Sequence, residues 1–194
     1  FLIIGGNGQL GKSLCNTKPE NLDLISYSKE EFNLLDIDIC LKKIEKVKPN
    51  YVINAAAYTA VDKAETESEL VEIVNAKNPY KIAFLLENLG SKFIQISTDF
   101  VFNGLKSSPY QTNDELLPLN EYGKSKALCE KLLVELSNTK IIRTSWLYSP
   151  FGKNFCLTML RLHKSCFDKE VPLRVVSDQI SCPTSSYSLS NVCW

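Results

Sequence analysis

Residues 5–11 read Gly-Gly-Asn-Gly-Gln-Leu-Gly and follow the apolar run Phe-Leu-Ile-Ile at residues 1–4. This order predicts a strand, a glycine turn and the N-terminus of a helix. Backbone N–H groups at such a turn can bind the pyrophosphate of a dinucleotide. Glycines after a strand also serve ordinary tight turns, so the motif alone is a weak signal. Its position at the first strand-to-helix junction favours dinucleotide binding.

A second signal lies at residues 122–126, which read Tyr-Gly-Lys-Ser-Lys. Tyr122 and Lys126 are four residues apart and would share one face of a helix. A cation beside a tyrosine lowers the tyrosine pKa, which makes the phenol a usable acid or base near neutral pH. A solvated helix face is the default for such a pair, but Ser97-Thr98-Asp99 lies at the end of the preceding predicted strand, where it could bring a hydroxyl next to Tyr122. Together the two signals favour a hydride-transfer enzyme in which Tyr122 handles the proton.

Short apolar runs alternate with helical patterns along the whole chain, which predicts βαβ units. The expected strands are Leu2–Ile4, Leu22–Ser26, Tyr51–Asn54, Phe93–Ser97 and Lys140–Arg143. The expected helices are Gln9–Cys15, Asp38–Val47, Glu69–Leu89, Tyr122–Leu136 and Phe155–Lys164. We therefore predict an α/β fold, a Rossmann-type doubly wound parallel sheet with helices on both faces.

The predicted ligand edge of the sheet carries further polar and aromatic groups. A polar segment at residues 103–121 is expected to lie over the carboxyl ends of the strands, where open α/β sheets bind ligands. Trp146 follows the last of these strands and fits a core residue and an aromatic wall for a flat ring equally well. The acidic residues between 62 and 69 fit a solvated helix start, and His163 fits a helix surface.

The composition excludes several classes of function. The 22 basic side chains equal the 22 acidic ones, so the charge gives no indication of binding to nucleic acid or to an anionic membrane. No apolar run approaches the roughly 20 residues of a membrane-spanning helix. The seven cysteines form no CxxC pair and there is one histidine, so we expect no metal site and reduced thiols in a cytoplasmic protein. Phe1 already lies inside a predicted strand, so we expect that residues precede it.

Several longer motifs together resemble one known family. They occupy residues 6–11, 54–65, 97–102, 122–126, 143–146, 152–155 and 178–184. In this order they resemble the dTDP-4-dehydrorhamnose reductase family, an extended short-chain dehydrogenase/reductase of nucleotide-sugar metabolism. The resemblance covers the whole chain, and the combination is more specific than any single motif.

The resemblance implies hydride transfer from a nicotinamide to the C4 carbonyl of dTDP-4-dehydro-L-rhamnose, which gives dTDP-L-rhamnose. Tyr122 would donate the proton. Lys126 would hold the nicotinamide ribose and lower the tyrosine pKa, and Thr98 would hydrogen-bond the substrate oxygen. The implied cofactor is NADPH, with NADH as the alternative.

The resemblance also implies the binding residues. The cofactor would contact Gly5, Gly8, Gln9, Leu10, Gly11, Asp36, Ile37, Ala57, Tyr58, Thr59 and Lys126. The nucleotide-sugar substrate would contact Val61, Thr98, Asp99, Tyr122 and Trp146. A homodimer stays open as an oligomeric state.

The chain departs from the family pattern at three positions. Phe100 stands where tyrosine is usual, Ser181 where glycine is usual, and Ser13 where glutamate is frequent, so an acidic, magnesium-linked dimer contact is not expected. The family also extends well beyond the equivalent of Trp194. We therefore expect residues 1–150 to form an NAD(P)-binding Rossmann domain and residues 151–194 to begin a truncated substrate-binding part. These residues alone should fold and bind dinucleotide but turn over nucleotide-sugar poorly.

Other functions stay open at this point. A non-catalytic NADP-binding regulatory protein, such as the β subunit of methionine adenosyltransferase, resembles the same family. Another extended short-chain reductase or an epimerase of nucleotide-sugars is a further alternative. A dehydratase fits less well, because Phe100 supplies no acid beside Thr98 and Asp99. Retention of Thr98, Tyr122 and Lys126 together favours catalysis.

Overall fold

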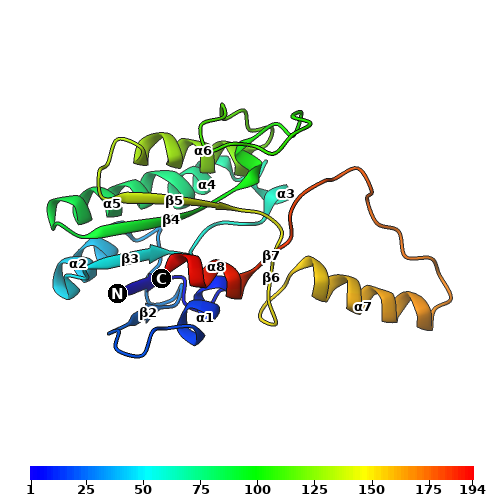
Figure 1. The fold of residues 1–194 in the computed structure, drawn as a ribbon, viewed down its shortest axis with the longest axis horizontal. Helices are drawn as coiled ribbons and strands as arrows, with labels where there is room; N and C mark the ends of the chain where they lie inside the picture. The colour runs from blue at the N-terminus through cyan, green and yellow to red at the C-terminus, as the bar shows by residue number, and fades with distance from the viewer.

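The protein is described by a computed structural model that covers residues 1–194 and contains a five-stranded parallel sheet (Figure 1). The strands are β1 (Leu2–Ile4), β2 (Ile25–Tyr27), β3 (Tyr51–Asn54), β4 (Lys92–Thr98) and β5 (Thr139–Thr144). Their order is β2-β1-β3-β4-β5, and every pair is parallel. The chain builds the sheet in one direction from β1 to β2 and then in the other direction through β3. The point where the strand order reverses therefore lies beside β1, and the prediction of a doubly wound sheet is confirmed.

Helices cover both faces of this sheet. They are α1 (Gln9–Asn16), α2 (Ile37–Val47), α3 (Val61–Ala64), α4 (Ser68–Glu72), the π-helical turn η1 (Ile73–Lys77), α5 (Asn78–Asn88), the 3₁₀ turn η2 (Asp99–Val101), α6 (Glu121–Leu133), α7 (Phe155–Asp168) and α8 (Ser186–Cys193). Two short strands, β6 (Leu147–Tyr148) and β7 (Thr184–Ser185), form a separate parallel pair. Figure 1 shows α5 and α6 on one side of the sheet and α1 and α8 on the other.

The apolar run at β1 is continuous because the strand is buried on both faces. Leu2 and Ile4 belong to the larger core, which α2, α5 and α6 close. Ile3 points the other way, into a smaller core that includes Leu14 of α1 and Leu189 of α8. Successive side chains of a strand alternate between faces, so a strand between two helical layers has no polar face.

Some elements differ from the sequence prediction. The predicted strand Leu22–Ser26 begins three residues later, at Ile25, because β2 is an exposed edge strand and its apolar pattern is weak. The predicted helix Glu69–Leu89 is divided by the π turn η1 between α4 and α5. The helix at 122–136 ends at Leu133. α3, α8 and the β6–β7 pair were not predicted.

Residues 151–194 do not pack together as one unit. α7 and the segment that follows it extend away from the sheet (Figure 1), and α7 has no buried residue. α8 returns to the sheet and packs on α1, where the Ser13 and Ser186 hydroxyls hydrogen-bond at 2.7 Å. The end of the chain therefore completes the layer that α1 begins, whereas the predicted division at residue 150 stays a prediction. No helix is long and apolar enough to cross a membrane.

Candidate functional site

A cleft of about 1050 Å³ runs along the carboxyl edge of the sheet. One end lies after β2, at Lys29 and Leu34. The middle is formed by the glycine turn after β1, and the other end by residues that follow β4 and β5. Such an edge, at the point where the strand order reverses, is where doubly wound sheets bind nucleotides.

Most residues that the resemblance assigned to ligands line this one cleft. They are Gly5, Gly8, Gln9, Leu10, Ala57, Tyr58, Thr59, Val61, Thr98, Asp99, Tyr122, Lys126 and Trp146. Asp36, Ile37 and Gly11 are not part of its wall. Near α2 the wall is formed by Phe32–Leu35 instead. The ligand roles of all these residues stay predictions.

The glycine turn is shaped by how closely its backbone segments approach one another. Gly5 has a φ of +87°, and a Cβ there would lie 2.8 Å from the backbone nitrogen of Ala56. A Cβ on Gly11 would lie 2.3 Å from the Gly5 oxygen. Gly11 therefore lets α1 begin directly against the turn, so that the N-terminus of α1 faces the cleft.

We expect Gly11→Ala to lower both stability and dinucleotide affinity. The added methyl group meets the backbone atoms of Gly5 and Gly6, which no side-chain rotation relieves, so the free energy of unfolding should fall by about 1–3 kcal/mol. Urea unfolding and a dinucleotide titration measure the two effects. Gly90→Ala is the control for affinity: Gly90 lies outside the cleft wall, and its φ of +71° means that the added methyl group should lower stability without changing dinucleotide affinity. Unchanged dinucleotide affinity in Gly11→Ala would contradict the role assigned to the turn.

Tyr122 and Lys126 both lie on α6 and both line the cleft. Lys126 is 2% exposed, and its Nζ donates a hydrogen bond of 2.6 Å to the Ile96 carbonyl of β4. Burial lowers the pKa of Lys126, and the Cys129 thiol and the Glu130 carboxylate partly oppose this shift. The ammonium is therefore directed at the sheet edge by a backbone acceptor.

The pKa of Tyr122 shifts in the direction opposite to the sequence prediction. Loss of water around the phenol raises this pKa, the nearby Thr98 hydroxyl lowers it, and the Asp99 carboxylate raises it further. Lys126 is not among the causes of this shift. The prediction of a lowered tyrosine pKa is therefore wrong for this structure, and Tyr122 keeps its proton at neutral pH.

The Thr98 hydroxyl is already hydrogen-bonded within the protein. It donates to Asp99 Oδ1 at 3.1 Å and accepts from the Phe100 N–H at 3.2 Å. Asp99 Oδ2 accepts from Ser181 Oγ at 2.8 Å, so the residue that replaces the usual glycine contacts a residue of the cleft wall. Opposite Thr98 in β5, the Thr144 hydroxyl is buried without any partner. An orphaned hydroxyl in a cleft wall marks a place where a ligand can supply the missing hydrogen bond.

Asn75 is a site residue that the sequence did not reveal. It lies in the π turn η1, is 1% exposed, and its Oδ1 accepts from the Tyr58 N–H at 2.8 Å. Its Nδ2 donates to the Tyr58 carbonyl at 3.0 Å and to Ser125 Oγ at 3.1 Å. One amide therefore joins the cleft wall at Tyr58 to the helix of Tyr122 and Lys126. The only sequence signal is an asparagine inside a helical pattern, which disfavours a regular helix.

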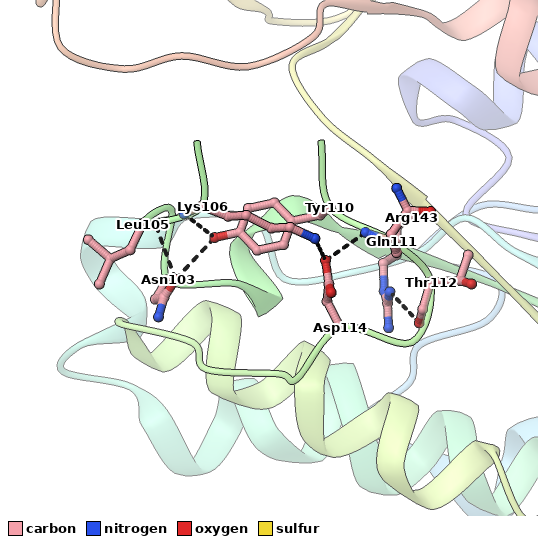
Figure 2. Close-up of polar contacts among 8 residues, drawn as sticks. All are labelled: Asn103, Leu105, Lys106, Tyr110, Gln111, Thr112, Asp114 and Arg143. Atoms are coloured by element: carbon pink, nitrogen blue, oxygen red, sulfur yellow. Dashed lines mark hydrogen bonds and ion pairs between the residues drawn. The ribbon is translucent and has the colours of Figure 1, made fainter. Parts of the chain in front are cut away.

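The segment after Phe100 is held together by its own polar contacts (Figure 2). The rings of Phe102 and Tyr110 stack at 4.1 Å, and the Tyr110 hydroxyl donates to Asn103 Oδ1 at 3.0 Å. Lys106 Nζ pairs with Asp114 at 2.5 Å. Figure 2 also shows Arg143 of β5 next to this loop, where its Nη1 donates to the Thr112 carbonyl at 3.1 Å.

Trp146 stands at the mouth of the cleft in a strained conformation. Its φ of +44° is unusual for a residue other than glycine, and its ring centroid lies 5.7 Å from that of Phe155. Backbone strain of this kind occurs preferentially at functional sites. The geometry favours the aromatic-wall interpretation over a core residue, because Trp146 is 37% exposed.

The fold and the site together define a member of the short-chain dehydrogenase/reductase class. The sheet is doubly wound, the glycine turn lies at its switch point, and a Tyr-x-x-x-Lys helix borders the same cleft. The model of the RmlD substrate binding domain family matches residues 1–194, and the chain belongs to this family.

Comparisons with individual proteins agree with this assignment. The chain is 41% identical to the dTDP-4-dehydrorhamnose reductase of Aggregatibacter actinomycetemcomitans over 99% of its own length and 65% of that protein. It is 38% identical to the spore coat polysaccharide biosynthesis protein SpsK of Bacillus subtilis, of which it covers 66%. The chain thus spans just under two thirds of the length of these relatives.

Solved structures show the same fold. A dTDP-4-dehydrorhamnose reductase from Clostridium acetobutylicum aligns with a TM-score of 0.93 at 38% identity, over 99% of this chain and 68% of that one. The Bacillus anthracis enzyme, solved in complex with NADP, aligns with a TM-score of 0.91 at 36% identity over the same shares.

Proposed function

We propose that this chain carries the cofactor site and the catalytic pair of an NADPH-dependent reductase that converts dTDP-4-dehydro-L-rhamnose to dTDP-L-rhamnose. The observation that carries the proposal is the single cleft that joins the glycine turn to Thr98, Tyr122 and Lys126. The relatives named dTDP-4-dehydrorhamnose reductase and the NADP complex of one of them support it.

The residues present fit a dinucleotide. The close approaches at Gly5 and Gly11 let α1 begin directly against the turn at the cleft wall, and the Thr144 hydroxyl lacks a partner at the other end. The pyrophosphate would lie against Gly8, Gln9 and Leu10. When bound, the reduced nicotinamide supplies the hydride.

The protein's own residues supply the remaining chemistry. Reduction of a ketone places negative charge on its oxygen, so a proton must be available within hydrogen-bond reach of that oxygen. Tyr122 holds such a proton because burial raises its pKa. Lys126 would hold the ribose hydroxyls, and Asp99, fixed by Thr98 and Ser181, would border the sugar.

The direct test is oxidation of NADPH by the natural full-length protein in the presence of dTDP-4-dehydro-L-rhamnose, with chromatography of the product. We expect NADP⁺ and dTDP-L-rhamnose in equal amounts. Binding of NADPH without its oxidation would support a regulatory protein instead. Conversion of the sugar without net loss of NADPH would support an epimerase. A cytoplasmic location and a homodimer remain predictions from sequence.

We expect the cofactor site to bind NADPH at least as tightly as NADH. Lys29 follows β2 in the cleft wall, where NAD-specific folds usually have a carboxylate that binds the ribose diol. A lysine there attracts a 2′-phosphate instead. Lys29→Gln should weaken NADPH binding by about tenfold, the lower end of the range for a hydrogen bond to a charged group, and leave NADH binding unchanged.

Fluorescence titration of both cofactors measures this prediction. Lys46→Gln, in the last turn of α2 and outside the cleft wall, is the matched control. Markedly tighter binding of NADH by the unmodified protein, or an unchanged NADPH-to-NADH ratio in Lys29→Gln, would refute the role of Lys29.

A further inference from the structure

Glu130 lies on the same face of α6 as the two residues of the catalytic pair. Tyr122, Lys126 and Glu130 follow one another at intervals of four residues, so each is one helical turn from the next. Glu130 is 4% exposed and takes no part in the chemistry proposed above. A buried carboxylate is costly for stability unless it is paired and hydrogen-bonded, so its presence here calls for an explanation.

Consecutive turns of α6 are attached to consecutive residues of β4. Lys126 Nζ donates to the Ile96 carbonyl at 2.6 Å, and the Ser97 hydroxyl donates to Glu130 Oε1. Both contacts are made to neighbouring residues of the same strand. A shift of α6 along β4 would therefore break both of them together.

Arg143 holds Glu130 from the neighbouring strand. It is the residue of β5 directly opposite Ser97. Its Nε donates to Oε1 at 3.0 Å and to Oε2 at 3.1 Å, and its Nη2 donates to Oε2 at 2.6 Å. This forked arrangement fixes direction as well as distance, which a single ammonium contact does not.

Arg143 also fixes the loop after the Thr98-Asp99-Phe100 turn. Its guanidinium carbon lies 5.0 Å from the Phe102 ring centroid, and its third nitrogen holds the Thr112 carbonyl (Figure 2). Phe100, at the start of this segment, meets the Tyr122 ring edge-on at 5.6 Å. One side chain thus connects β5, α6 and the segment that borders Tyr122.

We propose that the Glu130–Arg143 ion pair positions Tyr122 and Lys126 for catalysis by fixing α6 against β4 and the loop of residues 102–114. The inference rests on the proposed reductase function. Glu130 and Arg143 are positioning residues, because they act through Lys126, Phe100 and the helix and touch no ligand. Stability alone does not require a charged pair here, since well-packed apolar groups of similar volume often replace a largely buried ion pair without cost.

The test compares single and double variants of the natural full-length protein. Arg143→Met keeps a stem over Phe102 but leaves the Glu130 carboxylate buried and unpaired, so both thermal stability and turnover should fall. The double variant carries Glu130→Gln as well, which removes that charge and keeps an oxygen that can accept the hydrogen bond from the Ser97 hydroxyl. We expect the double variant to regain the wild-type Tm but not the wild-type kcat.

The expected loss of kcat in the double variant is about 10–100-fold, because a misplacement of order 1 Å costs about 10² in rate. KM for the nucleotide-sugar should stay within a factor of about two to three, because neither residue contacts it. Lys124→Met is the matched control: Lys124 lies on the same helix in an ion pair with Glu121, but its side chain is 56% exposed. It should leave both kcat and Tm unchanged.

The outcomes separate the inference from the function on which it rests. A double variant with both Tm and kcat at wild-type values would show a purely structural ion pair and overturn the inference alone. An equal loss in Lys124→Met would also overturn it. An unmodified protein that does not oxidise NADPH with the sugar would overturn the proposed function, and the inference with it.

Discussion

Tyr122→Phe is expected to lower turnover by about 10²–10⁴, the usual contribution of general acid catalysis, with NADPH affinity nearly unchanged. The substitution removes one hydroxyl and keeps the ring. The contact of that ring with Phe100 at 5.6 Å should therefore survive, and so should the packing of α6. The variant tests the proton donor and little else.

The structure strengthens this expectation for the reductive direction. Burial and the Asp99 carboxylate raise the pKa of Tyr122, so the phenol is protonated throughout the neutral range. A proton donor is active below its pKa. The profile of kcat/KM against pH should therefore show no loss from Tyr122 until the pH exceeds the ordinary tyrosine value of about 10.

Steady-state kinetics with dTDP-4-dehydro-L-rhamnose and an NADPH titration measure the two effects. Tyr51→Phe is the matched control, because Tyr51 stacks on Phe1 at the opposite end of the sheet and lies outside the cleft wall. Near-normal turnover in Tyr122→Phe would show that the proton donor is misassigned. A falling limb in the unmodified protein near pH 7 would contradict the raised pKa.

The sequence predicted the parts of the fold that local signals determine. β1 and the beginning of α1 were predicted at their observed residues, because an apolar run, four glycines and a helical pattern are all contained in the first 16 residues. α8 was not predicted, since Ser186–Cys193 contains three serines and no strong amphipathic pattern. Its helix is stabilised by contacts with α1, which lies more than 170 residues away along the chain.

The same division applies to the site. Tyr122, Lys126 and the glycines are close enough in sequence to be recognised as motifs. Asn75, Glu130 and Arg143 act through partners on other elements, and nothing in their spacing identifies those partners. The tyrosine pKa was predicted in the wrong direction for a related reason. Sequence spacing places a cation one turn from Tyr122, but it does not show that folding removes the water around the phenol, which is the main cause of the raised pKa.

The second large effect is expected for Lys126→Met. Lys126 would bind the nicotinamide ribose, and a hydrogen bond to a charged group contributes about 1.5–3 kcal/mol, so NADPH affinity should fall by about 10–100-fold. Turnover should fall as well, because the ribose no longer fixes the nicotinamide beside Tyr122. Methionine keeps a stem of similar length, so the loss measures the ammonium group.

The same substitution should not destabilise the protein. Burial lowers the pKa of Lys126 below the value of about 10.4 that it has in the unfolded chain. At neutral pH the unfolded state therefore binds the proton more strongly, and the charge opposes folding. Replacing the lysine by methionine would remove this penalty, although the Ile96 carbonyl loses its partner. We expect a Tm at pH 7 equal to or above that of the unmodified protein.

The pH dependence of stability separates the cost of burying the Lys126 charge from the loss of its hydrogen bond to the Ile96 carbonyl. The advantage of Lys126→Met should be largest below the pKa of the folded state and should shrink as the pH rises towards 10, where the unfolded lysine also loses its proton. Thermal unfolding at several pH values, with Lys124→Met as the exposed control on the same helix, measures this. A lower Tm for Lys126→Met at pH 7 would mean that the ammonium stabilises the fold. A gain in stability with a loss of NADPH binding would show that a buried charge is kept at this position for function, at the expense of stability.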